Sequence, residues 1–216
     1  MTQQILDEAN RAFQQGRLDE AERLLRSAVA AEPQSIVNHV ALATMLSERG
    51  QHAAATESYA QAMRIDRNRR GVAAAYAVSC YRAGRFDEAE KSARFAVQVE
   101  PGPGPYDTLA CALWEQGKLP DALAASEQAL AMAPDNVVAL NTKGRILLTM
   151  GRSAEALAIF EGLIKRGVVT PAMTLNQGAA LEKLGRTADA TRLYTEAAAR
   201  WSNFADLQRE RAQRHH

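Results

Sequence analysis

Glycine returns along this chain at a nearly fixed interval. Successive members of the set are 34, 34, 33, 34 and 34 residues apart: Gly16, Gly50, Gly84, Gly117, Gly151 and Gly185. An alanine stands five residues after each of them: Ala21, Ala55, Ala89, Ala122, Ala156 and Ala190. A period of this length that agrees in six copies is typical of helical hairpins stacked into a solenoid. The sequence therefore predicts an all-α, superhelical protein.

Each copy is expected to run as helix, turn, helix, turn. The glycine ends the first helix because it adopts the left-handed conformation at little cost. Acidic residues such as Asp87 and Glu88 then open the second helix, where they complement the positive end of the helix dipole. Three second helices are expected to end before a proline: Pro33, Pro101 and Pro134. Gly162 and Gly167 are expected to interrupt the second helix of the fifth copy.

The chain of 216 residues is expected to form one continuous array over residues 2–204. Its units are predicted at residues 2–35, 36–69, 70–102, 103–136, 137–170 and 171–204. Residues 205–216 are predicted to be a short C-terminal capping helix or tail, with Phe204 and Leu207 as its strong apolar contacts. His215 and His216 are native or the remnant of a tag, and no chemistry is assigned to them.

Small residues recur seven positions before each turn glycine: Ala9, Ala43, Ala77, Ala110, Gly144 and Gly178. They let two antiparallel helices approach closely, while larger side chains fill the space between. With the turn glycines, the following alanines and half of the closing prolines, this pattern makes residues 2–204 resemble the tetratricopeptide repeat family. The resemblance implies a right-handed superhelix of six hairpins whose first helices line a concave groove that binds extended or helical peptides.

The groove-facing positions follow from helical spacing, at thirteen, ten, six, three and two residues before each glycine. The predicted partner-binding residues at these positions are Phe13, Val40, Thr44, Val78, Tyr81, Arg82, Cys111, Trp114, Asn141, Arg145 and Leu148. Phe13, Tyr81 and Trp114 share one register and are expected anchors, because aromatic residues dominate binding hot spots. The alternative is that these rings pack on neighbouring first helices or on the C-terminal segment. Arg145 is expected either to grip a partner's carboxylate or to pair with Asp107 or Glu115.

Charge and composition argue against several other classes of function. The chain has 26 basic and 25 acidic residues, and residues 1–102 carry 13 of each sign, so no strong attraction to nucleic acid or to a membrane surface is expected. The basic turn at Arg64, Arg67, Arg69 and Arg70 is expected to be solvated, with phosphate contact as the alternative. Cys80 and Cys111 suit a reducing compartment, and a cytoplasmic location is expected. We expect no metal site, no cofactor and no catalytic residues, because the sequence contains no metal-binding, cofactor-binding or catalytic motif.

Two functions fit these observations. The first is a non-catalytic, bacterial-type adaptor or chaperone that holds a peptide or helical segment of a partner in its groove. The second is the substrate-recognition domain or subunit of a protein-modifying enzyme, of the glycosyltransferase, sulfotransferase or oxygenase type, as the family resemblance implies. The protein is expected to be a monomer or a weak homodimer.

Overall fold

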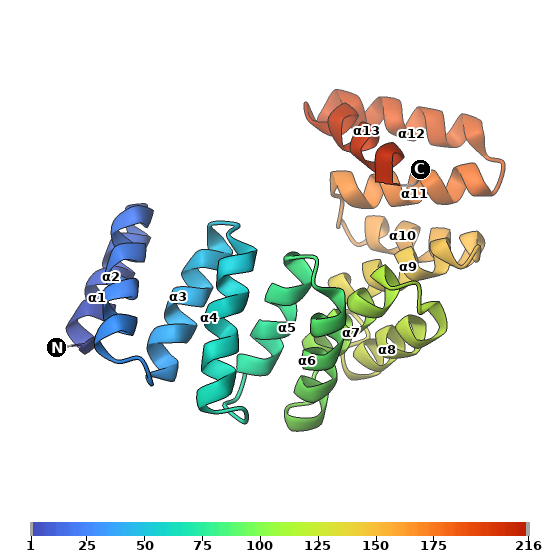
Figure 1. The fold of residues 1–216 in the computed structure, drawn as a ribbon. Helices are drawn as coiled ribbons and strands as arrows, with labels where there is room; N and C mark the ends of the chain where they lie inside the picture. Colours follow the sequence, from blue (N-terminus) through green and yellow to red (C-terminus); the bar gives the residue numbers. More distant parts are fainter. Residues whose placement is uncertain (1, 215–216) are drawn as a thin grey trace. The chain divides into compact units, whose positions relative to one another are not determined.

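The structure, a computed structural model, describes residues 2–214, which form thirteen helices and no strand. The prediction of an all-α fold is therefore confirmed. In chain order (Figure 1) the helices are α1 Thr2–Gln14, α2 Leu18–Ala31, α3 Ile36–Glu48, α4 His52–Ile65, α5 Val72–Arg82, α6 Phe86–Val99, α7 Pro103–Glu115, α8 Leu119–Met132, α9 Val137–Thr149, α10 Ser153–Lys165, α11 Pro171–Lys183, α12 Thr187–Arg200 and α13 Phe204–Arg214.

The turn glycines adopt the conformation expected of them. All six have a positive φ, between 73° and 79°. In the first turn Gly16 N–H donates to Phe13 O and Arg17 N–H donates to Ala12 O, both at 2.9 Å. These two bonds use carbonyl groups that the end of a helix otherwise leaves unpaired. The glycine at this position therefore ends α1 and reverses the chain.

The residue after the glycine pairs with the first turn of the second helix. Arg85 Nη2 lies 2.6 Å from Glu88 Oε1, and Arg152 Nε lies 2.7 Å from Glu155 Oε1. Arg186 makes the same contact with Asp189. These ion pairs lie at the surface, where solvent screens the attraction between the charges. They fix the start of a helix more than they stabilise the fold.

The chain divides into two compact units, at residues 1–116 and 117–216. Unit 1 contains the hairpins α1–α2, α3–α4 and α5–α6, followed by α7. Leu6, Leu25 and Leu46 belong to one buried cluster between the first two hairpins. The amide of Asn38, 1% exposed, donates to Ala28 O at 2.9 Å and so joins α3 to the end of α2. One continuous array over both units stays a prediction.

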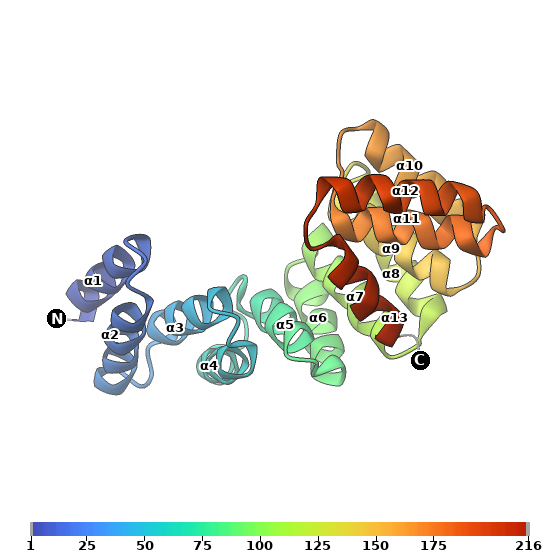
Figure 2. The ribbon, with the colours of Figure 1, turned by 90° about the horizontal axis from the view of Figure 1, so that it is seen from above.

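Unit 2 contains α8, the hairpins α9–α10 and α11–α12, and α13. Its core includes Leu147, Phe160 and Leu181. Helix α13 lies against the α11–α12 hairpin (Figure 2), with Phe204 fully buried beside Leu175 and Ala197. The ring of Phe204 lies 6.1 Å from those of Tyr194 and Trp201. Apolar contact through Phe204 thus holds α13 in place. His215 and His216 lie outside the described residues.

Helix α10 differs from what was expected of the fifth copy. Gly162 does not interrupt it, because the helix runs without a break from Ser153 to Lys165. It is 13 residues long, against 14 for the other second helices. Gly167 follows two residues after its end with a φ of +80°, and Val168 N–H donates to Leu163 O at 3.1 Å. The hairpin is shortened by a glycine turn that replaces the closing proline.

Candidate functional site

Six of the predicted partner-binding residues lie on the first helices of the three complete hairpins of unit 1. We call this set the first-helix face: Phe13 on α1, Val40 and Thr44 on α3, and Val78, Tyr81 and Arg82 on α5. Phe13 is 38% exposed, and Thr44 and Arg82 are also exposed. Val40, Val78 and Tyr81 are half-buried. The set therefore leaves apolar surface open to solvent on three successive hairpins.

Tyr81 is partly engaged within the fold. Its ring lies 5.8 Å from that of Phe86, at the start of α6. Its hydroxyl donates to Glu115 Oε1, on α7, at 3.3 Å. The ring thus contacts the second helix of its own hairpin, and the hydroxyl reaches the next first helix. The residue is half-buried, so part of its surface is still exposed to solvent.

Thr44 has a contact of its own on this face. Its Oγ1 lies 3.1 Å from the hydroxyl of Tyr59, which comes from α4 and is 6% exposed. Val40 packs against the same buried cluster as Tyr59. The second helix thus reaches through the hairpin to hold the first-helix side chains. Such support keeps a contact surface in one arrangement before a partner arrives.

The remaining predicted residues are more buried or already paired. Cys111 is 9% exposed, and Trp114 is half-buried. In unit 2, Leu148 is 6% exposed and belongs to the same core cluster as Ala179 of the next hairpin. Because Cys111 and Leu148 expose so little area, a binding role for them stays a prediction that the packing does not favour. Asn141 Oδ1 accepts a bond of 3.5 Å from Asn176, and Arg145 beside it is half-buried.

A cleft between two second helices of unit 1 was not anticipated from the sequence. The α4–α6 cleft, as we call it, is lined by Glu57, Ala60, Gln61, Met63, Arg64, Arg67, Tyr76, Arg85, Glu88, Lys91, Ser92 and Phe95. Met63 and Tyr76 line both of its halves. One signal in the sequence was the basic run that contains Arg64 and Arg67. Helical spacing had directed attention to the first helices instead.

Burial and hydrogen bonding perturb three titratable groups at this place. Burial is the main cause that raises the pKa of Tyr76 above its usual range, and the Tyr76 hydroxyl donates to Glu88 Oε2 at 3.1 Å. Burial also raises the pKa of the neighbouring Cys80 thiol, to about 11. The hydrogen bond from Arg85 lowers the pKa of Glu88. Glu88 is therefore a carboxylate already satisfied by Arg85 and Tyr76.

Two further kinds of site were sought among residues 2–214. No group of three or more His, Cys, Asp or Glu side chains in this range is placed to hold a metal ion. None of the described helices is both long and apolar enough to cross a membrane.

Comparison with known proteins places this geometry in a family. Sequence profiles of the tetratricopeptide repeat match residues 6–27 and 71–94, and residues 108–167 and 141–205. A search among curated proteins gave no match.

Several solved structures are similar in fold to this chain at low sequence identity. PilW, a widely conserved type IV pilus biogenesis factor, superposes with a TM-score of 0.79 at 18% identity, covering 92% of each chain. PilF from Pseudomonas aeruginosa gives 0.73 at 18% identity, covering 97% of each chain. YrrB, described as a protein with an unusual peptide-binding site, gives 0.59 at 16% identity over 80% of this chain and 90% of its own. At these identities the likeness shows the fold alone. With the profile matches and the six turn glycines, it establishes that the chain belongs to the tetratricopeptide repeat family.

Proposed function

We propose that this protein is a non-catalytic adaptor that holds a peptide or helical segment of a partner protein against its first-helix face. The observation that carries the proposal is the apolar surface left open on the first helices of three successive hairpins. Phe13 is 38% exposed, while Val40 and Val78 are half-buried on the next two hairpins. Apolar surface that stays open on successive hairpins of a solenoid suits an elongated partner segment.

The family and its structural relatives support the general role. Tetratricopeptide repeat proteins are scaffolds for protein interaction, and the relatives include one type IV pilus biogenesis factor and one protein with a peptide-binding site. We extend this role to the present chain with a protein or peptide as partner and with no cofactor. A monomeric or weakly dimeric state and a cytoplasmic location complete the proposal.

Capture from the native lysate tests the proposal. The baits are the wild-type chain and the double variant Phe13→Glu with Arg82→Glu, both of which change exposed side chains. We expect the wild-type bait to retain a partner that the variant loses by at least tenfold in quantitative mass spectrometry. Circular dichroism of the variant should show the same helical content as the wild-type chain. A partner that is itself an enzyme, or its substrate, would identify a substrate-recognition subunit instead.

The matched control changes exposed apolar residues elsewhere. Val99→Glu with Met132→Glu alters side chains that are 45% and 50% exposed at the ends of second helices α6 and α8. This control should capture the same partner as the wild-type chain. If both variants lost the partner equally, the first-helix face would not be the site that binds it.

A further inference from the structure

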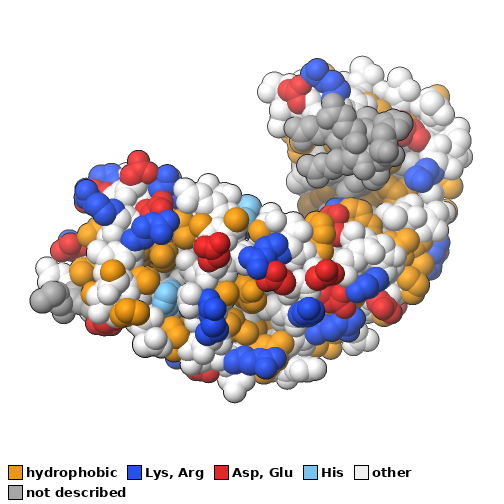
Figure 3. Space-filling view, in the orientation of Figure 1, with side chains coloured by type: hydrophobic (Ala, Val, Ile, Leu, Met, Phe, Trp, Pro, Cys, Tyr) orange, Lys and Arg blue, Asp and Glu red, His pale blue; other side chains and the backbone are white. Residues whose placement is uncertain are grey.

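The α4–α6 cleft has an apolar floor and a basic rim. Met63, Tyr76 and Phe95 supply the apolar and aromatic surface. The larger of its two halves has a volume of about 560 Å³ and the smaller about 230 Å³, and both are open to solvent. In Figure 3 hydrophobic atoms lie between Lys and Arg side chains over α4 and α6. This is enough room for a few side chains of a peptide, but it does not enclose a small molecule.

The repeats themselves show that this place departs from the common pattern. Phe95 stands eleven residues after its turn glycine. The other five repeats carry only polar residues or glycine there: Ser27, Gln61, Gln128, Gly162 and Glu196. Packing of the solenoid therefore does not require an aromatic ring at this register. Phe95 is the one exception among six copies, and it is half-buried at the surface of α6.

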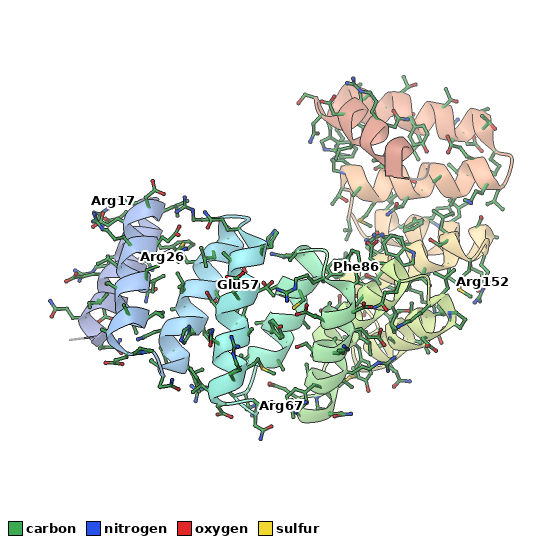
Figure 4. All side chains as sticks on the ribbon, in the orientation of Figure 1. Arg17, Arg26, Glu57, Arg67, Phe86 and Arg152 are labelled. Carbon is green, nitrogen blue, oxygen red and sulfur yellow. The ribbon has the colours of Figure 1, made fainter. Side chains whose placement is uncertain are left out.

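A second departure touches the first. Arg67 occupies the register at which three other repeats carry a closing proline: Pro33, Pro101 and Pro134. Its guanidinium lies over the ring of Phe95, with Cζ 4.1 Å from the ring centroid. Figure 4 shows Arg67 beside the neighbouring ends of α4 and α6. Two unusual residues from adjacent repeats thus meet in the cleft and place a positive charge beside its apolar floor.

The charges that line the cleft do not cancel. Four are basic and two are acidic: Arg64, Arg67, Arg85 and Lys91 against Glu57 and Glu88. Glu88 is already bonded to Arg85 and Tyr76. The side chain of Arg64 lines the cleft, and it forms no ion pair or hydrogen bond with the side chains of the other described residues. The rim therefore presents an excess of positive charge to whatever approaches, within a chain whose total charge is only +1.

We propose that the α4–α6 cleft is a second docking site, separate from the first-helix face, for an acidic segment of a partner protein that inserts an aromatic or long aliphatic side chain. The inserted side chain is held against Met63, Tyr76 and Phe95 by apolar burial. Carboxylates that flank it are held by Arg64, Arg67 and Lys91. A peptide fits better than a nucleic acid, because the positive charge is confined to one cleft and does not follow a long track of phosphates.

A peptide selection tests this site. A random twelve-residue library displayed on phage is selected on the immobilised full-length chain, and the enriched sequence is made as a fluorescent peptide. We expect a class rich in Asp and Glu around an aromatic or aliphatic residue. Its affinity by fluorescence anisotropy should fall at least tenfold with Arg64→Glu plus Lys91→Glu, and also with Phe95→Gln. The last change restores the polar side chain that two other repeats carry.

Matched controls separate this site from general charge and from the first-helix face. Arg23→Glu plus Lys165→Glu makes the same charge change at the same two registers of other repeats, and it should leave affinity unchanged. The first-helix double variant should also bind the peptide normally, so the two proposals can fail independently. If Phe95 serves only the stack, Phe95→Gln would lower the thermal midpoint and leave affinity intact.

Three results would overturn the inference. The first is the absence of any acidic class among the selected peptides. The second is an acidic class whose affinity the cleft variants do not change. The third is tighter, cleft-dependent binding of a labelled twenty-nucleotide polyuridine than of the peptide, which would assign the cleft to nucleic acid.

Discussion

At the scale of single residues, the small side chains of the repeat are matched to large ones across the hairpin. A Cβ added at Gly144 would lie 2.6 Å from Cε1 of Phe160, which is far inside van der Waals contact. Gly178 meets the ring of Tyr194 in the same way. The sequence predicted that small residues are needed at this register. The choice of glycine over alanine in these two repeats follows from the aromatic partner.

Gly144→Ala is expected to destabilise the protein by about 1–2 kcal/mol. Overpacking costs about 1–3 kcal/mol, and alanine recovers up to about 1 kcal/mol through its better helix propensity. Urea unfolding followed by circular dichroism measures the difference. Adding Phe160→Leu recreates the Ala9 and Leu25 pair of the first repeat, so the double variant should lose less than the sum of the two single changes. A more stable Gly144→Ala variant would show that Phe160 is not tightly held.

Because the Cys80 thiol is buried, we expect the folded protein to lose stability at alkaline pH. Burial raises the pKa of this thiol to about 11, so the folded chain keeps the thiol proton to a higher pH than the unfolded chain does. This contribution is complete below the ordinary thiol pKa of about 8.5 and is lost as the pH rises towards 11. The urea midpoint should therefore fall more steeply between pH 8.5 and 11 for the wild-type chain than for Cys80→Ala. Parallel curves would contradict the burial of this thiol.

Leu148 shows where residue-level prediction stops. Helical spacing places Leu148 in the same register as Phe13, Tyr81 and Trp114. It was therefore predicted to be a partner-binding residue. Its exposure depends on its neighbour, because Ala179 of the next hairpin shares its core cluster. Periodicity fixes which way a side chain points, but the next repeat determines whether that side chain is covered.

At the scale of elements, helix ends were predictable and the second-helix surface was not. The turn glycines and closing prolines fixed most boundaries, because both act through local backbone geometry. The α4–α6 cleft depends on side chains from α4, α5 and α6 that meet only after the hairpins stack. Its signal in the sequence was a departure from the repeat at Phe95 and Arg67, which a comparison of the six copies with one another reveals.

The two glycines of the fifth repeat should respond oppositely to alanine. Gly162 lies inside α10, exposed and with nothing within 4 Å of an added Cβ, so Gly162→Ala should stabilise by up to about 1 kcal/mol. Gly167 ends the helix with a φ of +80°, so Gly167→Ala should cost about 1–2 kcal/mol. Thermal unfolding of both single variants measures the two effects. A destabilising Gly162→Ala would mean that α10 does break at this glycine.

At the scale of the whole molecule, the repeat was enough to predict the fold and the family, because a solenoid is built from contacts between successive copies. The identity of the partner is not encoded in that pattern. It depends on surface side chains that differ from copy to copy, such as Phe13 and Phe95. Of the two faces proposed for unit 1, one lies on the first helices and the other mainly on the second helices α4 and α6, with Tyr76 of α5 between them.

The most direct test of the central claim is site-specific photo-crosslinking in the native lysate. Thr44, exposed on the first-helix face, is replaced by photoreactive benzoylphenylalanine, and the same replacement is made at the exposed Ala30 on α2 as a control. Illumination should give a discrete adduct with the probe at Thr44 and none with the probe at Ala30. An adduct at Ala30 alone, or none at either position, would contradict a partner-binding role for the first helices.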